Sequence, residues 1–366
     1  MNVGIDTFGC DHGKNGTGSY LRHLSAKLPD DGVVRYELFG SEVDRYTYSG
    51  NFRSVSVPDN IAAERFWHLF RVNAFATRSG YDAVLYVAGS RLLPRSFAVP
   101  GVAVVNELVA SRAKASDWRY RRHIQKSLSR AACIVAASQA VRKDLERVGI
   151  TAPVEVIHNG VDHSLFYPEN RLTERLEVKP FAIKRPYFVY ASRLSGPEKK
   201  HMELIKAFSL FKERTGLPHR LVLAGSESGY GDAVRKAAFS SGAASDIFIT
   251  GYFPHESFPE LYRNAEACLF PAVNEGVGLP VLEAMATGIP VACAKNGALP
   301  ELAGAYALYF DSDSPDDVAQ AMEKISTDTA LRERLSSGGI EWTKRFSWEK
   351  TAAATHELLK RVVAKT

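Results

Sequence analysis

The sequence predicts an α/β protein with two doubly wound domains, each a parallel sheet flanked by helices. Strand-like runs alternate with helical patterns up to residue 157, and the alternation restarts at residue 187. Between these halves, residues 159–186 hold turns, prolines and charges with little periodicity. A chain of 366 residues is long enough for two ordinary domains. We therefore expect an N-terminal domain over 1–165, a linker over 166–186 and a C-terminal domain over 187–346.

In the first half, short apolar runs predict strands and amphipathic stretches predict helices. Strands are expected at residues 1–6, 36–40, 55–58, 82–87, 102–107, 133–138 and 154–157. Helices are expected at residues 18–28, 62–78, 117–131 and 139–148. Ser138 is a typical helix cap and Gly149 a typical stop, so the last of these helices has defined ends.

The loop after the first strand carries Asn15-Gly16-Thr17-Gly18. A strand, a glycine-rich loop and a helix in this order are typical of a phosphate-facing turn in a doubly wound fold. The spacing is not that of a dinucleotide fingerprint, and a flexible turn explains the loop equally well when it is taken alone.

The second half repeats the pattern. Strands are expected at residues 187–192, 220–225, 247–251, 267–271 and 290–294. Helices are expected at residues 201–214, 230–241, 256–264, 279–287, 315–326, 328–344 and 348–363. Asp311-Ser312-Asp313 has the spacing of a metal-binding pair of aspartates, but Ser314 and Pro315 follow as a helix cap and first helical residue. A turn into a capped helix explains these residues, and we expect no metal.

Composition excludes several classes of protein. The chain is 45% hydrophobic and 24% charged, and no run of 18 apolar residues predicts a membrane span. The first residues lack a basic segment followed by an apolar one, so we expect no secretion signal. The sequence shows no platform of aromatic and basic residues, so we do not expect nucleic-acid binding. The cysteines show no C-x-x-C spacing and three fall in expected strands, which favours a cytoplasmic protein without disulfides: Cys10, Cys133, Cys268 and Cys293.

Positive charge is concentrated in the first half. Residues 62–130 hold 12 Lys and Arg but four acids, which favours anionic partners such as phospholipid or a phosphorylated acceptor. The expected helix 62–78 is basic and aromatic, which is typical either of a membrane-surface helix or of a core helix with snorkelling arginines. Since its aromatic residues do not share one stripe, we expect them in the core and assign any membrane contact to the charges: Phe66, Trp67, Phe70 and Phe75. Residues 117–123, DWRYRRH, form a second basic cluster.

Two cations and two carboxylates carry the expected chemistry of the second half. Arg193 ends a strand and Lys199 begins a helix, at the edge where open α/β sheets bind ligands. Both cations suit a diphosphate and can neutralise charge that develops on it as a leaving group. In PAVNEGVGLPVLEAMATGIP, residues 271–290, Glu275 and Glu283 flank a glycine-rich helix start. Such a helix start attracts anions, and the two carboxylates suit hydroxyl groups, so the pattern indicates a nucleotide-sugar.

These motifs resemble those of retaining GT-B glycosyltransferases of family 4. The matching stretches are SRL…PEKKH…LIKAF, the segment 250–304 with its E-x7-E pair, GAYALYFDSDS, RFSWEKTA, VIHNGVDHSLFYP, ASQAVRKDL and the loop at residues 16–20. The similarity covers nearly the whole chain and is looser before residue 130, where the acceptor usually binds. It implies a GT-B fold, two Rossmann-like domains facing a cleft, with the last helix at about 347–366 crossing back to the first domain.

The resemblance also implies roles for single residues. Arg193 and Lys199 would hold the donor diphosphate. Lys200 is the alternative to Lys199, but the spacing to Phe208 favours Lys199. Glu275 would bind the sugar hydroxyls and Glu283 the ribose hydroxyls.

The remaining donor contacts expected from the resemblance come from backbone and loop residues. A helix start would offer its amides to the phosphate and sugar, one loop would border the base, and one loop would face the diphosphate from the first domain. In that order these residues are Gly276, Val277, Gly278 and Leu279; Tyr252 and Phe253; and Gly16 and Gly18.

One position departs from the family pattern. The strand at 102–107 ends in Asn106-Glu107, where the family usually has a histidine that contacts the sugar near the reacting carbon. Asn106 can offer a hydrogen bond but cannot take a proton. Either Asn106 suffices, or His12 or Glu107 serves instead, or activity is reduced.

The sequence therefore predicts a cytoplasmic, metal-independent retaining glycosyltransferase. It would move a hexose from a nucleoside diphosphate donor, GDP-mannose first and a UDP-hexose second, to a glycan or lipid-linked acceptor at the inner membrane face. A catalytically weak GT-B subunit that binds a partner is the alternative, motivated by Asn106. Synthesis of a soluble disaccharide is a third possibility, less favoured because the first half is basic.

Overall fold

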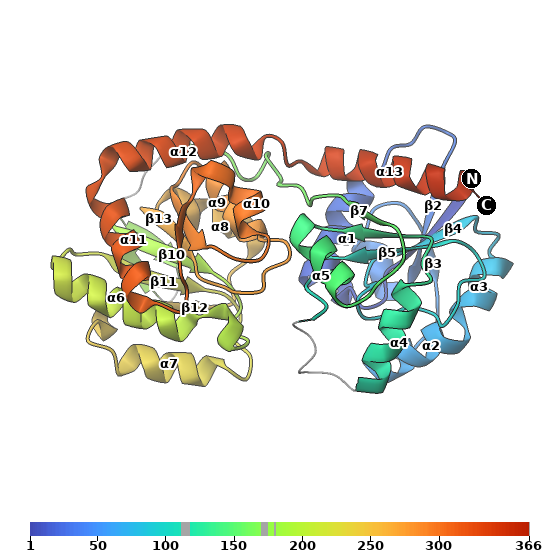
Figure 1. The fold of residues 1–366 in the computed structure, drawn as a ribbon, viewed down its shortest axis with the longest axis horizontal. Helices are drawn as coiled ribbons and strands as arrows, with labels where there is room; N and C mark the ends of the chain where they lie inside the picture. The colour runs from blue at the N-terminus through green and yellow to red at the C-terminus, as the bar shows by residue number, and fades with distance from the viewer. Residues whose placement is uncertain (111–117, 170–174, 179–180, 366) are drawn as a thin grey trace. The chain divides into compact units, whose positions relative to one another are not determined.

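The computed structural model describes residues 1–110, 118–169, 175–178 and 181–365, which form two compact units (Figure 1). The first unit consists of Met1–Gly160 and Phe346–Thr366, and the second unit of Val161–Arg345. The last helix, α13 (Trp348–Ala364), therefore belongs with the N-terminal part of the chain.

The first unit is built on a seven-stranded parallel sheet in the order β3-β2-β1-β4-β5-β6-β7. Its strands are β1 (Asn2–Asp6), β2 (Arg35–Gly40), β3 (Asn51–Ser54), β4 (Ala83–Tyr86), β5 (Gly101–Val105), β6 (Cys133–Ala136) and β7 (Val154–Val156). Strands β4, β5 and β6 are buried along their whole length, which explains their continuous apolar sequence. Strand order reverses between β1 and β4, so the unit is doubly wound with its switch point there.

Helices cover both faces of this sheet. They are α1 (Gly16–Lys27), α2 (Ile61–Phe70), α3 (Val72–Arg78), α4 (Trp118–Leu128), α5 (Gln139–Arg147) and α13. Helices α2 to α5 contribute to one apolar cluster with the strands, whereas α13 packs against α1, with the rings of Tyr20 and Trp348 5.8 Å apart. Ser138 caps α5 by accepting a hydrogen bond from the Val141 amide at 3.2 Å, as the sequence predicted.

Three expectations for the first unit are wrong. The strand expected at 55–58 is β3 at Asn51–Ser54 instead, an edge strand whose mostly polar residues hide its period. The helix expected at 62–78 is two helices that meet at Arg71. The aromatic residues expected in its core divide: Trp67 is 8% exposed, but Phe66 and Phe70 are 55% and 53% exposed.

The second unit contains a six-stranded parallel sheet in the order β12-β11-β10-β13-β14-β15. Its strands are β10 (Tyr187–Ala191), β11 (Arg220–Ala224), β12 (Ile247–Gly251), β13 (Ala267–Phe270), β14 (Val291–Ala294) and β15 (Leu308–Phe310). Its helices are α6 (His201–Thr215), α7 (Gly231–Phe239), α8 (Phe258–Arg263), α9 (Leu279–Ala286), α10 (Leu299–Ala303), α11 (Pro315–Thr327) and α12 (Thr329–Thr343). The switch point lies between β10 and β13. Both sheets are thus parallel and doubly wound, as the sequence predicted.

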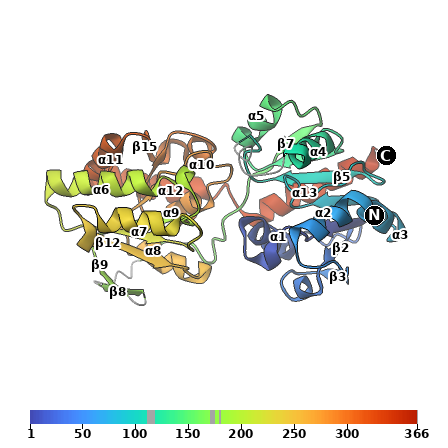
Figure 2. The same ribbon diagram turned by 90° about the horizontal axis from the view of Figure 1, so that it is seen from below.

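Several segments of the second unit add to that prediction. Residues 166–186, expected as a linker, contain the antiparallel pair β8 (Arg175–Val178) and β9 (Phe181–Lys184), which Figure 2 shows from below. Strand β15 and helix α10 were not expected because each is short. Ser314 caps α11 through the Asp317 amide, which confirms the turn proposed for Asp311 to Asp313.

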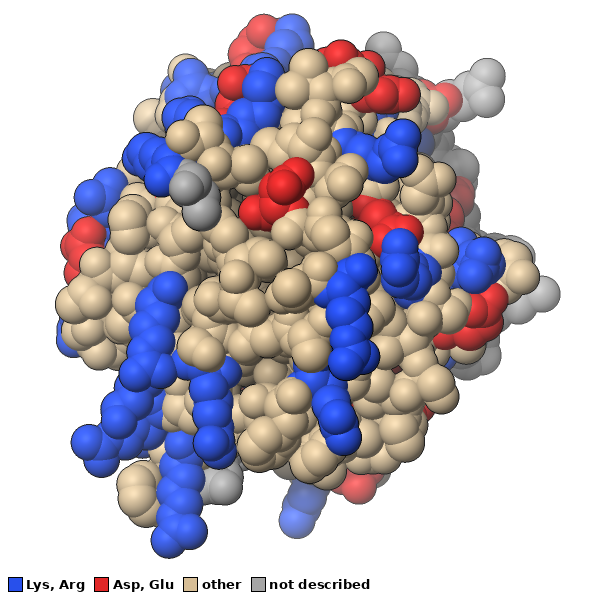
Figure 3. Space-filling view, turned by 90° about the vertical axis from the view of Figure 1, so that its right-hand side faces the viewer, with Lys and Arg blue, Asp and Glu red and all other residues tan. Residues whose placement is uncertain are grey.

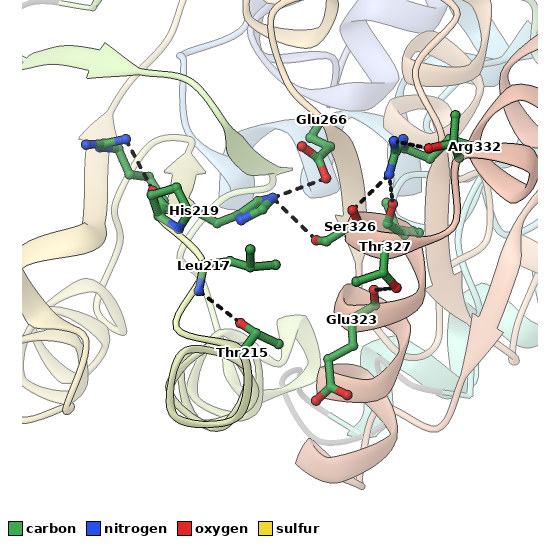
Figure 4. Close-up of polar contacts among 12 residues, drawn as sticks. Thr215, Leu217, His219, Glu266, Glu323, Ser326, Thr327 and Arg332 are labelled. Carbon is green, nitrogen blue, oxygen red and sulfur yellow. Dashed lines mark hydrogen bonds and ion pairs between the residues drawn. The ribbon is translucent and has the colours of Figure 1, made fainter.

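At the amino edge of this sheet a buried histidine, His219, contacts Glu266 and helix α11 (Figure 4). Nε2 of His219, just before β11, lies 3.1 Å from Glu266 Oε1 and 3.3 Å from Ser326 Oγ of α11. Its ring stacks on Phe188 at 5.0 Å, and Arg332 of α12 donates to the Ser326 carbonyl at 3.0 Å. These contacts join α11 and α12 to the sheet at the edge opposite the strand ends where α/β folds bind ligands.

Candidate active site

The carboxyl end of β10 carries both expected cations of the second unit. Arg193 follows the strand and is exposed. Among the described residues, none forms an ion pair with its guanidinium. Lys199 ends a short 3-10 helix, Pro197–Lys199, and the Tyr190 hydroxyl donates to its carbonyl at 2.8 Å. The buried strand thus fixes the backbone on both sides of the turn that bears the cations.

The carboxyl end of β13 carries the Glu275 loop, residues 271–278. Its backbone turns sharply because Asn274 and Gly278 both have φ of +60°. The Val273 amide donates to the Glu198 carbonyl at 2.9 Å, which ties this loop to the turn after β10. Lys199 Nζ consequently lies 3.1 Å from Glu275 Oε2, with both side chains about one-fifth exposed (21% and 20%). The structure therefore brings these two predicted residues together at the switch point.

Gly297 supports this loop from behind. Its φ is +58°, and a Cβ placed there would lie 2.5 Å from the Glu275 carbonyl oxygen. The next amide, of Ala298, donates to the same oxygen at 2.9 Å. Gly297 was not predicted as a site residue, although the Asn296-Gly297 pair before a short helix is a turn signal that could have indicated a role.

Glu283 lies on α9 and is nearly buried, at 9% exposure. Its Oε1 is 3.0 Å from Nε2 of His255, which follows β12. His255 was not predicted as a site residue. The two side chains join the loop after β12 to helix α9, and the Phe166 ring packs on His255 at 5.3 Å. Burial, and to a smaller extent the negative charge of Glu283, raises the pKa of the Tyr262 hydroxyl.

The other expected donor residues of this unit line the same edge. Tyr252 follows β12 and is 77% exposed, and Phe253 packs on Phe258 with ring centroids 5.0 Å apart. Gly278 precedes α9 in a left-handed conformation, and a Cβ there would meet Leu299 at 2.9 Å. Gly276 and Val277 precede α9 and Leu279 is its first residue, and the amides at such a helix start attract anions.

The two residues after Lys199 face elsewhere. Lys200 has a left-handed backbone, with Nζ 2.5 Å from Asp313 and 3.4 Å from Glu203. It therefore does not share the contact of Lys199 with Glu275. His201 is fully buried against the Tyr190 ring, 4.9 Å away. Burial and the charge of Lys199 lower the pKa of His201 to about 4.

In the first unit, the two predicted glycines differ. Gly16 begins α1, and a Cβ there would meet nothing within 4 Å. Gly18 packs on the preceding turn, since a Cβ there would lie 2.2 Å from the Cys10 carbonyl oxygen. Its amide already donates to Asn15 Oδ1 at 2.7 Å. Gly16 is thus open to a ligand, whereas Gly18 is required by packing.

Histidines and carboxylates gather at the carboxyl edge of this first sheet. His12 Nδ1 is 2.8 Å from Asp44 and its Nε2 is 3.5 Å from Asp59, and the hydrogen bond to Asp44 raises the pKa of His12. His68 Nε2 is 2.7 Å from Asp6, both side chains being buried. Burial lowers the pKa of His68, but the adjacent Asp6 more than offsets this and raises it. The edge is therefore acidic.

Asn106 follows β5 and is partly buried. Both polar atoms of its side-chain amide are shielded, and no described residue forms a hydrogen bond with either atom. Glu107 accepts a hydrogen bond from the Ser90 hydroxyl at 2.5 Å and lies 3.5 Å from Arg91. An unpartnered buried amide is costly and is a feature that a ligand group can satisfy.

The described part of the chain contains no group of three or more His, Cys, Asp or Glu that could hold a metal ion. Over the same residues, no helix is both long and apolar enough to cross a membrane.

Comparison with known families agrees with this geometry. Residues 173–342 match the family model described as glycosyl transferases group 1, and residues 14–165 match the model of glycosyltransferase family 4. The chain belongs to these glycosyltransferases. Each model covers most of one unit, so both halves are accounted for.

Two curated relatives match parts of the chain. O-antigen chain mannosyltransferase B of Escherichia coli is 31% identical over 46% of this chain and 44% of its own length. D-inositol 3-phosphate glycosyltransferase of a Nocardioides species is 32% identical over 58% of this chain and 49% of its own length. The chain thus spans about half the length of the curated relatives it matches.

The fold has solved counterparts. Sucrose-phosphate synthase from Thermosynechococcus elongatus superposes with a TM-score of 0.77 over 100% of both chains, at 19% identity. At this identity the likeness shows the fold, an α/β glycosyltransferase fold with two Rossmann-like units.

Most of the residues predicted to bind the donor belong to the second unit. Arg193, Lys199, Glu275 and Glu283, with the loop at Tyr252 and the start of α9, lie on one sheet edge. Gly16, Gly18 and Asn106 belong to the first unit and follow strands of its own sheet. Gly297 and His255 are additions that the structure makes to the sequence-based set.

Proposed function

We propose that the protein transfers a hexose from a nucleoside diphosphate donor to a glycan or lipid-linked acceptor. The observation that carries the proposal is the pair of Lys199 and Glu275 at the switch point of the second unit, 3.1 Å apart. Arg193 follows β10, the same strand that precedes Lys199. A partly exposed ion pair costs about 1 kcal/mol or less to separate, so Lys199 and Glu275 can exchange their contact for a diphosphate and sugar hydroxyls.

In this proposal the second unit stabilises the leaving group. Arg193, Lys199 and the amides at the start of α9 neutralise charge on the departing diphosphate, so no metal is needed. The bond between the sugar C1 and the phosphate oxygen breaks as the acceptor oxygen bonds to C1 on the same face. The acceptor proton passes to the departing phosphate oxygen, and the configuration at C1 is retained.

GDP-mannose is the donor we favour, supported by the partial likeness to O-antigen chain mannosyltransferase B, and a UDP-hexose is the alternative. A thermal-shift series with GDP-mannose, UDP-glucose and ADP-glucose tests this choice. A donor at a hundredfold excess over its dissociation constant raises the free energy of unfolding by about 2.7 kcal/mol. Stabilisation by none of the three, with no transfer, would count against the proposal.

We further propose that the reaction takes place in the cytoplasm, with the protein in peripheral contact with an anionic membrane. The basic composition of residues 62–130 and the four free, buried cysteines support this placement.

Transfer assayed with EDTA tests the proposed metal independence. Unchanged activity is expected, and a loss of activity that Mg²⁺ or Mn²⁺ restores would contradict it.

A second candidate function rests on Asn106. No described residue hydrogen-bonds its side-chain amide, and the resemblance predicts histidine at this position. These two observations support a catalytically weak subunit that acts through a partner. Replacement by the usual residue, Asn106→His, separates the two. A large gain in transfer by the variant favours the weak-subunit proposal, and a loss favours an active enzyme adapted to asparagine.

A further inference from the structure

The outer surface formed by α2, residues 88–98 and α4 is basic and apolar together. Helix α4 carries four cations and no acid, and neither α3 nor residues 88–98 contain an acid, while α2 contains one, Glu64. Figure 3 faces this end of the first unit, and Lys and Arg gather in the lower half of the view. The cations of these elements, of the adjoining α3 and of the turns that follow α2 and α4 are Arg65, Arg71, Arg78, Arg91, Arg95, Arg119, Arg121, Arg122, Lys126 and Arg130.

Contacts join these elements into one continuous surface. The Arg65 guanidinium lies over the Tyr120 ring at 4.0 Å, which connects α2 to α4. Arg95 lies over the Phe70 ring at 5.2 Å, and its carbonyl accepts a hydrogen bond from Arg130 at 2.7 Å. The aromatic and cationic side chains are therefore neighbours and not separate patches.

Large apolar side chains on this surface are turned to solvent. Phe66 and Phe70 are one helical turn apart, with ring centroids 5.0 Å apart and more than half of each side chain exposed (55% and 53%). Trp118, at the start of α4, is 59% exposed. The inner faces of α2 and α4 contribute Trp67, Ile124 and Leu128 to the apolar core, so the exposed rings are not needed for core packing.

The cations of α4 follow one stripe. Arg119, Arg122 and Lys126 are exposed at spacings of three and four residues, and Arg130 is exposed just beyond the helix end. A helix that buries one face and presents cations beside exposed aromatic rings suits the interface of an anionic bilayer, where rings enter the headgroup layer and cations meet phosphates.

We propose that this surface docks the protein on an anionic lipid bilayer. Charge complementarity identifies the occupant, and the exposed rings distinguish a bilayer from a dissolved polyanion, which would meet the cations but leave the rings in water. The docking rests on the peripheral membrane contact proposed above and assigns it to a surface. It does not depend on the transfer reaction, so loss of vesicle binding and loss of transfer are separate outcomes.

Sedimentation with vesicles tests the proposal on the full chain. We expect binding to vesicles of phosphatidylcholine with 30% phosphatidylglycerol, weakening as salt rises, and little binding to phosphatidylcholine alone. The charge variant Arg95→Glu with Arg122→Glu, and the ring variant Phe66→Ser with Phe70→Ser, should each lower vesicle binding by about tenfold or more. All these side chains are exposed, so the folds should be kept, which circular dichroism checks.

Matched controls come from the second unit. Phe239 is 85% exposed on α7 and Lys236 is exposed on the same helix, so Phe239→Ser and Lys236→Glu repeat the chemistry elsewhere. These variants should bind vesicles like the wild type. Equal loss in the control variants, no preference for phosphatidylglycerol, or loss in the charge variant but not in the ring variant would overturn bilayer docking. The last result would indicate a dissolved polyanion as the occupant.

Discussion

The carboxyl edges of the two parallel sheets have opposite chemistry. The second unit presents Arg193 and Lys199 beside a helix start, with Glu275 and Glu283 among them. The first unit presents carboxylates and histidines, including the buried Asp44, which contacts His12 and Thr7. The same fold thus gives one edge suited to an anion and one suited to hydroxyl or cationic groups. We infer that the donor diphosphate is carried by the second unit.

The largest expected effect comes from removing Lys199. Lys199→Ala should lower kcat/KM for the donor by about 10² to 10³, because a preorganised charge on the leaving group is lost. Lys200→Ala is the matched control, since its side chain pairs with Asp313 and Glu203. Steady-state kinetics compares the two. A greater loss from Lys200→Ala would reverse the assignment of the lysines.

His201 should make the second unit sensitive to acid. Its folded pKa of about 4 lies below the unfolded value of about 6.5, so the unfolded chain binds more protons between these values. The associated stability is full above pH 6.5 and is lost as pH falls toward 4, a change on the order of 3 kcal/mol. His201→Phe should flatten this acid limb in thermal unfolding at several pH values. An unchanged pH dependence would show that other groups control it.

Gly297→Ala should damage the site through the backbone. The added Cβ would meet the Glu275 carbonyl oxygen, an overpacking cost of about 1–3 kcal/mol, and should shift Glu275 away from Lys199. Gly216→Ala is the control, because Gly216 has a similar φ of +63° but open space around it. Thermal unfolding and transfer assays should show a larger loss for Gly297→Ala. Equal losses in the two variants would mean that only the backbone conformation matters.

A smaller effect is expected at His255. His255→Gln should raise the donor KM about threefold to tenfold with little change in kcat, since a hydrogen bond to the Glu283 carboxylate is worth about 1 kcal/mol. If Glu283 binds the ribose, the variant should also discriminate less between ribose and 2′-deoxyribose donors. Kinetics with the two donors measures this, and unaltered discrimination would leave His255 a purely structural contact.

The sequence was sufficient for both sheets because their central strands are buried on both faces and read as unbroken apolar runs. Short or polar elements were missed for the same reason: β3 is a polar edge strand, and β15 has three residues. The exposed rings of Phe66 and Phe70 were placed in the core because periodicity reports an apolar residue and not whether a partner covers it.

The candidate site was likewise predicted only in part. Spacing around Glu275 and Arg193 was informative because both residues follow strands whose ends meet at one edge. Gly297 and His255 reach that edge from other segments, through contacts that depend on how loops pack. Gly18 could not be separated from Gly16, since a glycine needed for packing and one open to a ligand have the same sequence signal.

Calorimetric titration of GDP and UDP tests the central inference most directly. Wild-type protein should bind one of them, and the double variant Arg193→Ala with Lys199→Ala should bind it at least about a hundredfold more weakly, since two charge-assisted hydrogen bonds are lost. His12→Ala, which alters the acidic edge of the first unit, should leave the affinity unchanged. Unchanged affinity in the double variant, with loss in His12→Ala, would contradict the assignment of the diphosphate to the second unit.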